Sequence, residues 1–113
     1  MAFFVDMRAN PLGSLAFGSI SGTYAAIGTP FLHPMRAIAI KNYTNAQITF
    51  SFDGINDHVT LIALAGEVLD VSSWEFQGNG LLISNMTQMY AKQTSGAPTS
   101  GSVYIEAFYA RGS

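Results

Sequence analysis

The chain has 113 residues and a formal net charge of −2. Only 11% of the residues are charged, whereas a typical soluble domain carries about 25%. The absence of cysteine excludes disulfides, a thiol nucleophile and zinc sites with sulfur ligands. Lysines and arginines are scattered along the chain, so no basic stripe can neutralise the phosphates of a nucleic acid. We therefore expect one domain with one hydrophobic core and no nucleic-acid partner.

The sequence also predicts a soluble protein without membrane contact. Its first residues, MAFFVDMRANP, lack a basic region followed by a long apolar core, so they do not resemble a signal peptide. The longest charge-free run, residues 9–35, is interrupted by glycines and prolines. Such a run cannot form a membrane-spanning helix of about 20 apolar residues.

Uncharged polar residues take the place of the missing charges. The chain contains 11 serines, 8 threonines, 6 asparagines and 4 glutamines, and a further 11 glycines. A monomer with so few charges and a net charge near zero tends to associate with itself. We therefore expect a homo-oligomer, or a surface covered by other subunits. The alternative is a monomeric β-domain rich in serine and threonine.

Residues 1–34 contain apolar side chains without a regular period, and they are interrupted by glycines and prolines. We predict an extended N-terminal arm or irregular edge strands over 1–34, followed by a β-sandwich domain over 35–113. As an arm, this segment would dock on a neighbouring subunit through apolar and aromatic residues. The candidate interface residues in it are Leu12, Leu15, Phe17, Tyr24 and Ile27.

From residue 36 onward, apolar and polar residues alternate and turn signals follow at short intervals. This pattern predicts an all-β fold, either a single antiparallel β-sandwich or a jelly-roll-like barrel. A turn is expected at Ala65 and Gly66. The expected strands cover residues 36–43, 46–52, 58–64, 67–73 and 102–110, with one or two more within 80–93.

The last expected strand, residues 102–110, is apolar on both faces. Val103 and Ile105 lie on one face, and Tyr104 and Phe108 lie on the other. An apolar second face must be covered, so Tyr104 and Phe108 are candidate interface residues. Either a partner or the N-terminal segment covers them, or they pack under a loop of the same chain.

The segment FDGINDH, residues 52–58, places two carboxylates, an amide and an imidazole in one loop, which raises the possibility of a metal or acid–base site. An EF-hand loop requires glycine at its sixth position, but here Gly54 directly follows Asp53. No local spacing links His58 to the other histidine, His33. No serine lies in a Gly-x-Ser-x-Gly elbow, because GSISG at 18–22 has isoleucine at the centre.

We interpret this segment as the turn of a hairpin over residues 46–64. Asp53 and Gly54 set the turn, because Gly accepts a positive φ and Asp can bond to its own local backbone. We therefore expect no catalytic, metal-binding or cofactor-binding residue, no cofactor and no enzyme activity.

Trp74 and the tyrosines could form a platform on which a sugar stacks. A single tryptophan is a weak indication of such a platform. We favour Trp74 as a core residue or an interface anchor that follows the strand over 67–73.

Several stretches resemble a family of small proteins from the structural gene clusters of tailed bacteriophages, in the same order along the chain. The Asp-Gly-x-x-Asp-His turn and the later Thr-Ser-Gly-x-Val-Tyr hairpin are the most specific of them. The matching stretches are LGSLAF, IGTP, FSFDGINDH, LDVSS and YAKQTSGAPTSGSVYIEAFYARG. The resemblance carries over no catalytic residues.

The resemblance implies a virion component: a capsid decoration protein, a head-to-tail joining protein or a tail component. Its partners would be other virion proteins, namely capsid, portal or tail subunits, and further copies of the chain. The alternative is a carbohydrate- or receptor-binding β-sandwich module. The two functions differ in whether Trp74 and the loop 94–102 contact protein subunits or sugar.

Overall fold

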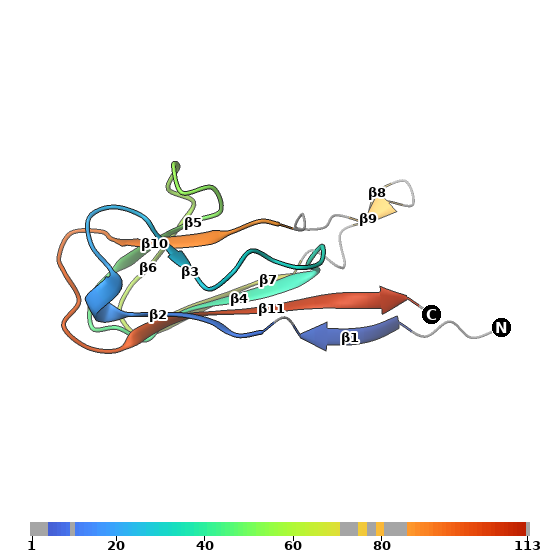
Figure 1. Ribbon diagram of the computed structural model, residues 1–113, viewed down its shortest axis with the longest axis horizontal. Helices are drawn as coiled ribbons and strands as arrows, with labels where there is room; N and C mark the ends of the chain where they lie inside the picture. The colour runs from blue at the N-terminus through green and yellow to red at the C-terminus, as the bar shows by residue number, and fades with distance from the viewer. Residues whose placement is uncertain (1–4, 10, 71–74, 77–78, 81–85, 113) are drawn as a thin grey trace.

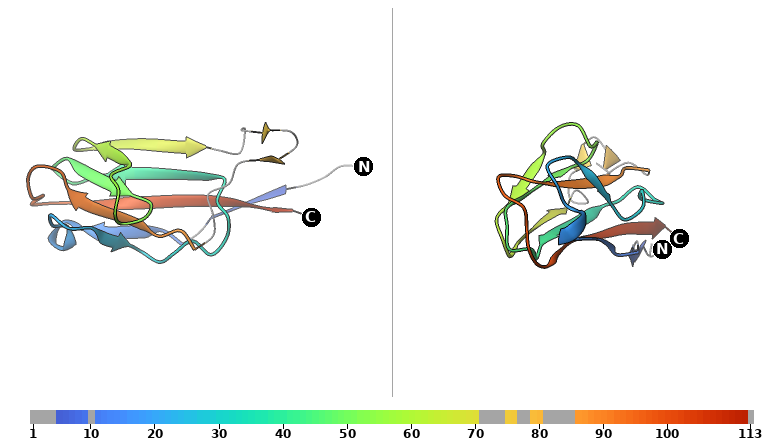
Figure 2. Two further views of the ribbon diagram at one scale, coloured as in Figure 1. Left: turned by 90° about the horizontal axis from the view of Figure 1, so that it is seen from above. Right: turned by 60° about the vertical axis from the view of Figure 1, so that its left-hand side comes forward.

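The computed structural model describes residues 5–9, 11–70, 75–76, 79–80 and 86–112 (Figure 1). These residues form two antiparallel sheets that pack face to face, which confirms the predicted all-β sandwich (Figure 2). Sheet A contains β1 (Val5–Ala9), β2 (Gly13–Ala16), β4 (Ala37–Asn42), β7 (Ala65–Asp70) and β11 (Ser102–Gly112). Sheet B contains β3 (Ala25–Ile27), β5 (Ile48–Ser51), β6 (Val59–Leu61) and β10 (Met89–Gln93). A short 3-10 turn, η1 (Phe17–Ser19), follows β2, and β8 (Glu75–Phe76) pairs with β9 (Asn79–Gly80).

The strand order explains the arrangement of the layers. Sheet A runs β1-β11-β4-β7, with β2 pairing along the same side of β11 as β1, and sheet B runs β3-β10-β5-β6. Neighbouring strands are antiparallel throughout. The core lies between the sheets because alternate residues of each strand point inward. Its largest fully buried apolar side chains are Phe50, Met35, Ile38, Ile40, Ile48, Met89 and Val103.

Most of the strands expected after residue 36 are present with small changes at their ends. Residues 46–64 form the predicted hairpin, in which Ile48 is opposite Leu61. The turn expected at Ala65 and Gly66 was placed two residues too late. Pairing with β4 extends to Ala65, so the turn lies at residues 63–64 and β7 begins at Ala65. Within 80–93 the structure has β9 and β10, while 81–85 lie outside the described residues.

Residues 1–34 were predicted to form either an extended arm or irregular edge strands. The described part of this segment forms edge strands. β2 pairs with β11, and β3 pairs with β10, both within the same chain. Ile20, Ile27 and Phe31 belong to the common hydrophobic core. The hypothesis of an arm ordered mainly by neighbours is therefore wrong for residues 13–31. Their irregular spacing reflects a chain that passes from sheet A to sheet B and contributes apolar residues from the connections.

The side chain of Asn42, at the end of β4, connects the two sheets. It is fully buried, and its Nδ2 donates to the carbonyl oxygens of Leu61 and Ile62, at 3.0 and 3.1 Å, where β6 ends. Nδ2 also lies 2.8 Å from the carbonyl oxygen of Ala46. Its Oδ1 accepts hydrogen bonds from the backbone N and the Oγ1 of Thr44, at 3.0 and 2.6 Å. One amide thus joins sheet A, the turn after β4 and sheet B.

We expect Asn42→Ala to lower the free energy of unfolding by at least about 2 kcal/mol, because it removes the acceptor of the buried Thr44 N–H and a buried donor to the Leu61 carbonyl oxygen. Urea denaturation measures this change. Asn45→Ala is the matched control: Asn45 binds Thr99 at 2.6 Å in an exposed position, where water can replace it, so its loss should cost less than about 1 kcal/mol. Equal effects of the two substitutions would contradict the role of Asn42.

Candidate interaction surface

The face of sheet A that points away from sheet B, which we call the outer face, is assembled from strands distant in sequence. Directly opposite residues in antiparallel strands share a face. The register therefore places Glu106, Ala39 and Val68 in one row across β11, β4 and β7. The neighbouring rows contribute Tyr104, Lys41, Phe108 and Ala37.

An ion pair lies at the centre of the outer face. Lys41 Nζ is 3.0 Å from Glu106 Oε2, and both side chains are about one-third exposed. The hydrogen bond to the Glu106 carboxylate raises the pKa of Lys41 above its ordinary value. The two charges therefore satisfy each other within the chain, and the middle of the face has no net charge.

Around this ion pair the outer face is largely apolar. Val68 is 68% exposed, and Tyr104 and Phe108 are half-buried. The Tyr104 ring meets the ring of Tyr43 edge to face, with centroids 5.6 Å apart. A depression of about 260 Å³ lies beside Phe108, and Leu12, itself 59% exposed, forms part of its wall. The chain thus covers part of this face itself and leaves apolar surface in contact with water.

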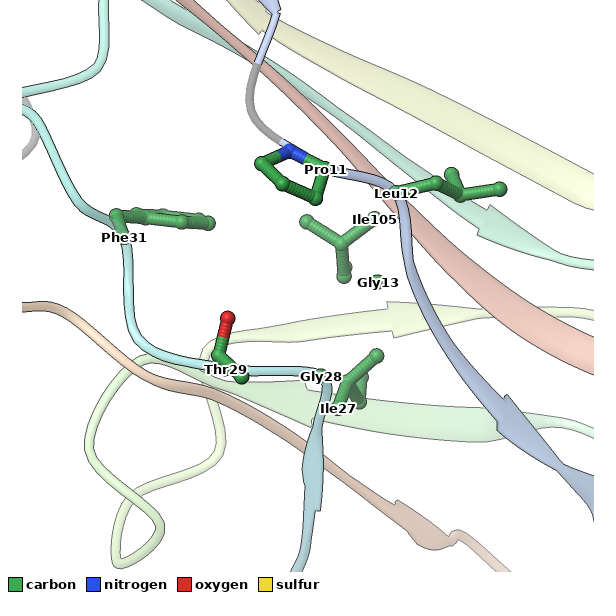
Figure 3. A pocket seen from close by; sticks show the side chains of 8 residues that line it. All are labelled: Pro11, Leu12, Gly13, Ile27, Gly28, Thr29, Phe31 and Ile105. Atoms are coloured by element: carbon green, nitrogen blue, oxygen red, sulfur yellow. The ribbon is translucent and has the colours of Figure 1, made fainter.

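A second hollow opens at the edge of the sandwich, between the chain before β2 and the chain after β3 (Figure 3). It has a volume of about 170 Å³ and reaches the core. Gly28 has a φ of 65°, and a Cβ there would lie 3.0 Å from the Cα of Gly13, so glycine is required for this close approach. The lining consists of Pro11, Leu12, Gly13, Ile27, Gly28, Thr29, Phe31 and Ile105. Its mostly apolar wall suits an apolar side chain.

Asp53 organises the loop between β5 and β6. Its Oδ1 accepts hydrogen bonds from the backbone N of Ile55 and Asn56, at 2.8 and 2.9 Å, and from Ser51 Oγ at 2.8 Å. Its Oδ2 accepts from Asn56 Nδ2 at 2.8 Å. These bonds, led by the one from the Asn56 backbone, hold the pKa of Asp53 well below its ordinary value. His58 Nδ1 accepts from the backbone N of Phe52 at 3.0 Å. The polar groups of the loop thus bind to the loop itself.

The other end of this loop is tied to the surface of sheet B. Asp57 Oδ1 accepts a hydrogen bond from the Tyr24 hydroxyl and lies 3.1 Å from Lys92 Nζ. The ammonium group of Lys92 also lies 4.7 Å from the centre of the Tyr24 ring. Burial, and then the bond to Asp57, raises the pKa of Tyr24 to about 12. Tyr24 therefore stays protonated at neutral pH and acts as a donor that holds the loop.

The candidate interface residues have different positions in the fold. Ile27 is 2% exposed inside the chain's own core, so it is not available to a partner and its assignment as an interface residue was wrong. Tyr24 is bound within the chain, and Leu15 packs against the core. Leu12, Phe17, Tyr104 and Phe108 keep surface exposed or half-exposed, whereas Trp74 lies outside the described residues.

Two elements of the outer face were not predicted from the sequence. Val68 and the Lys41–Glu106 ion pair depend on which strands become neighbours, and β4, β7 and β11 are far apart in the chain. Alternation alone places each residue on one of two faces. It does not say which residues of other strands will lie beside it.

No protein-family model, curated protein or solved structure matches this chain significantly. Within the described part of the chain, no helix is long and apolar enough to cross a membrane. In the same residues, no three side chains of the His, Cys, Asp and Glu types are grouped so that they could hold a metal ion.

We expect Gly54→Val to lower the free energy of unfolding by about 1 kcal/mol or more. Gly54 has a φ of 76°, and a Cβ there would lie 3.1 Å from the Tyr90 ring. Gly96→Val is the matched control, because nothing lies within 4 Å of a Cβ at that position. Its effect should stay within about 0.5 kcal/mol. Thermal unfolding of both variants measures the difference, and equal stabilities would show that the turn does not need glycine.

Asp53 should make the stability of the protein depend on pH in the acid range. Its folded pKa lies below the ordinary value of 3.8, so its contribution is fully present above about pH 4 and is lost as the pH falls through the folded pKa. Denaturation curves between about pH 2 and 6 should show this loss in the unmodified protein. In Asp53→Asn the curve should be flatter at the acid end, and an unchanged slope would contradict the assignment.

Proposed function

We propose that the chain is a non-enzymatic structural protein of a tailed-phage virion, held on the particle by protein–protein contacts. It would serve as a capsid decoration or cement protein, a head-to-tail joining protein or a tail component. Its partners would be capsid, portal or tail subunits and further copies of itself, and it would join the particle in the cytoplasm of the bacterial host. The virion assignment rests on the sequence resemblance, and the contact role rests on the outer face of sheet A.

The apolar outer face is the observation that carries the contact role. Val68 and Leu12 expose large apolar side chains, and Phe108 lies beside the depression next to Leu12. Covering apolar area contributes roughly 25 cal/mol per Å² to association. The charges in the middle, Lys41 and Glu106, are already paired, so a partner that covers them need not supply countercharges. Desolvation of this pair opposes binding, so the favourable free energy of the contact comes from the apolar residues around the pair.

The low charge content supports the same role. A chain with 11% charged residues and a net charge of −2 has little electrostatic protection against association. The polar groups of the loop at residues 52–58, which could have formed a reactive site, bind to one another and to the backbone. They therefore serve to build the loop.

The alternative function, carbohydrate or receptor binding, would need an accessible aromatic face for stacking. The Tyr24 ring is covered by the ammonium group of Lys92. Tyr43 keeps 50% of its surface exposed, and Trp74 lies outside the described residues. The contact role is preferred because both the resemblance and the apolar outer face support it.

The proposal predicts that Leu12→Lys reduces incorporation into virions at least tenfold, because it places a charge on the rim of the apolar face. Leu32→Lys is the matched control: Leu32 is 61% exposed, close to the 59% of Leu12, and does not line the depression beside Phe108. Phage particles carrying each variant would be purified and the chain quantified by mass spectrometry. If Leu12→Lys reduces incorporation into virions and Leu32→Lys does not, the result supports the outer face as the contact surface. The absence of the unmodified chain from particles would refute the virion role.

A further inference from the structure

Among the strands that the structure describes, the four edges of sheets A and B differ in their protection against pairing with another strand. Unpaired edges are templates for association, and proteins protect them with short strands, prolines, bulges or charges. The edges of sheet B are β3 and β6, which have three residues each. One edge of sheet A is divided into β1 and β2, with Pro11 between them. The other edge, β7, is a continuous strand of six residues without proline, lysine or arginine.

We propose that β7 of one copy pairs with β1 of a second copy, so that sheet A continues from one molecule into the next. This inference rests on the proposed structural role and specifies how copies of the chain contact one another. It names the two strands, their direction and their register.

The direction of the strands permits this pairing between copies in the same orientation. β1 is antiparallel to β11, β11 to β4, and β4 to β7. The two edge strands β1 and β7 therefore run in opposite directions within one molecule. When a second copy is placed beside the first in the same orientation, its β1 is antiparallel to the neighbouring β7, and the alternation continues. Such a head-to-tail contact generates a ring if the rotation closes and a filament if it does not.

Charge selects β1 as the partner of β7. The sequence of β7, AGEVLD, contains two acidic residues and no basic one. Two copies of β7 side by side would bring four carboxylates together, and like charges on adjacent strands are destabilising. β1, VDMRA, carries one acidic and one basic residue, Asp6 and Arg8, and among the edge strands that the structure describes it is the one with a basic residue. The partner that compensates the charge of Glu67 is therefore the β1 strand of another copy.

The register follows from the faces of the sheet. Position 8 pairs with Tyr109, which packs against the core, and position 67 pairs with the core residue Ile40. Because directly opposite residues share a face, positions 8 and 67 both lie on the core-facing side of a continued sheet. Placing Arg8 opposite Glu67 aligns all five residues of β1 with residues 66–70 of β7. Position 7 is then opposite Val68. Val68, which is 68% exposed in the single molecule, thus gains an apolar neighbour.

Cysteine pairs test the contact directly, because the chain has no cysteine of its own. Opposite residues on antiparallel strands have Cα atoms about 4.5–5.5 Å apart, within the range of a disulfide. Mild oxidation of Met7→Cys/Val68→Cys should produce a ladder of dimers, trimers and larger species on a non-reducing gel, and reductant should collapse it. Met7→Cys/Ile55→Cys is the control: Ile55 is 80% exposed on the loop at 52–58, and this variant should give no ladder.

The single variant Val68→Cys separates this pairing from the symmetric one. It should give no disulfide-linked dimer on the non-reducing gel, since each β7 faces a β1 that carries no cysteine. An efficient disulfide dimer of Val68→Cys would show that β7 pairs with itself and would overturn the proposal. The proposal would also be overturned if Met7→Cys/Val68→Cys gave no ladder although circular dichroism showed that this variant is folded. If the double variant gives no ladder but the unmodified chain is found in virions, the strand pairing is refuted and the proposed function stands. If the ladder forms but the unmodified chain is absent from virions, the strand pairing stands and the proposed function is refuted.

Discussion

The buried amide of Asn42 is the interaction on which the sandwich depends. Two sheets packed through apolar side chains have no directional bond between them, so their relative position depends on shape alone. Asn42 supplies directional bonds, because its donors reach the end of β6 in sheet B while its oxygen holds Thr44 in the turn after β4. The same turn lies so close to residue 101 that a Cβ there would be 2.1 Å from the carbonyl oxygen of Tyr43. Glycine at this position therefore completes the arrangement.

The two sides of sheet A have different consequences for the molecule. The residues on the inner side are buried in the core, whereas the outer side has an ion pair within the chain, Lys41–Glu106, surrounded by apolar residues. Beyond the region where the sheets overlap, β1 and the end of β11 continue as a two-stranded extension (Figure 1). The core stabilises the fold, whereas the outer face keeps apolar surface, such as that of Val68, in contact with water.

The polar loop over residues 52–58 shows how a group of reactive residue types can serve structure alone. Asp53 accepts bonds from two backbone amides, and Asp57 binds Tyr24 and Lys92. The loop is therefore bound to both sheet B and itself.

The sequence alone determined the strands after residue 36 and the hairpin over 46–64, because burial of one face imposes a period of two and Asp-Gly favours a positive φ. It also placed Tyr104 and Phe108 together on the second face of the last strand, because the alternation within one strand shows which residues share a face. Tertiary structure decided that Ile27 is a core residue, that Asn42 is buried, and that Val68 lies beside Ala39. These outcomes depend on which distant segments become neighbours, and contacts between strands of separate parts of the chain leave no local period to read.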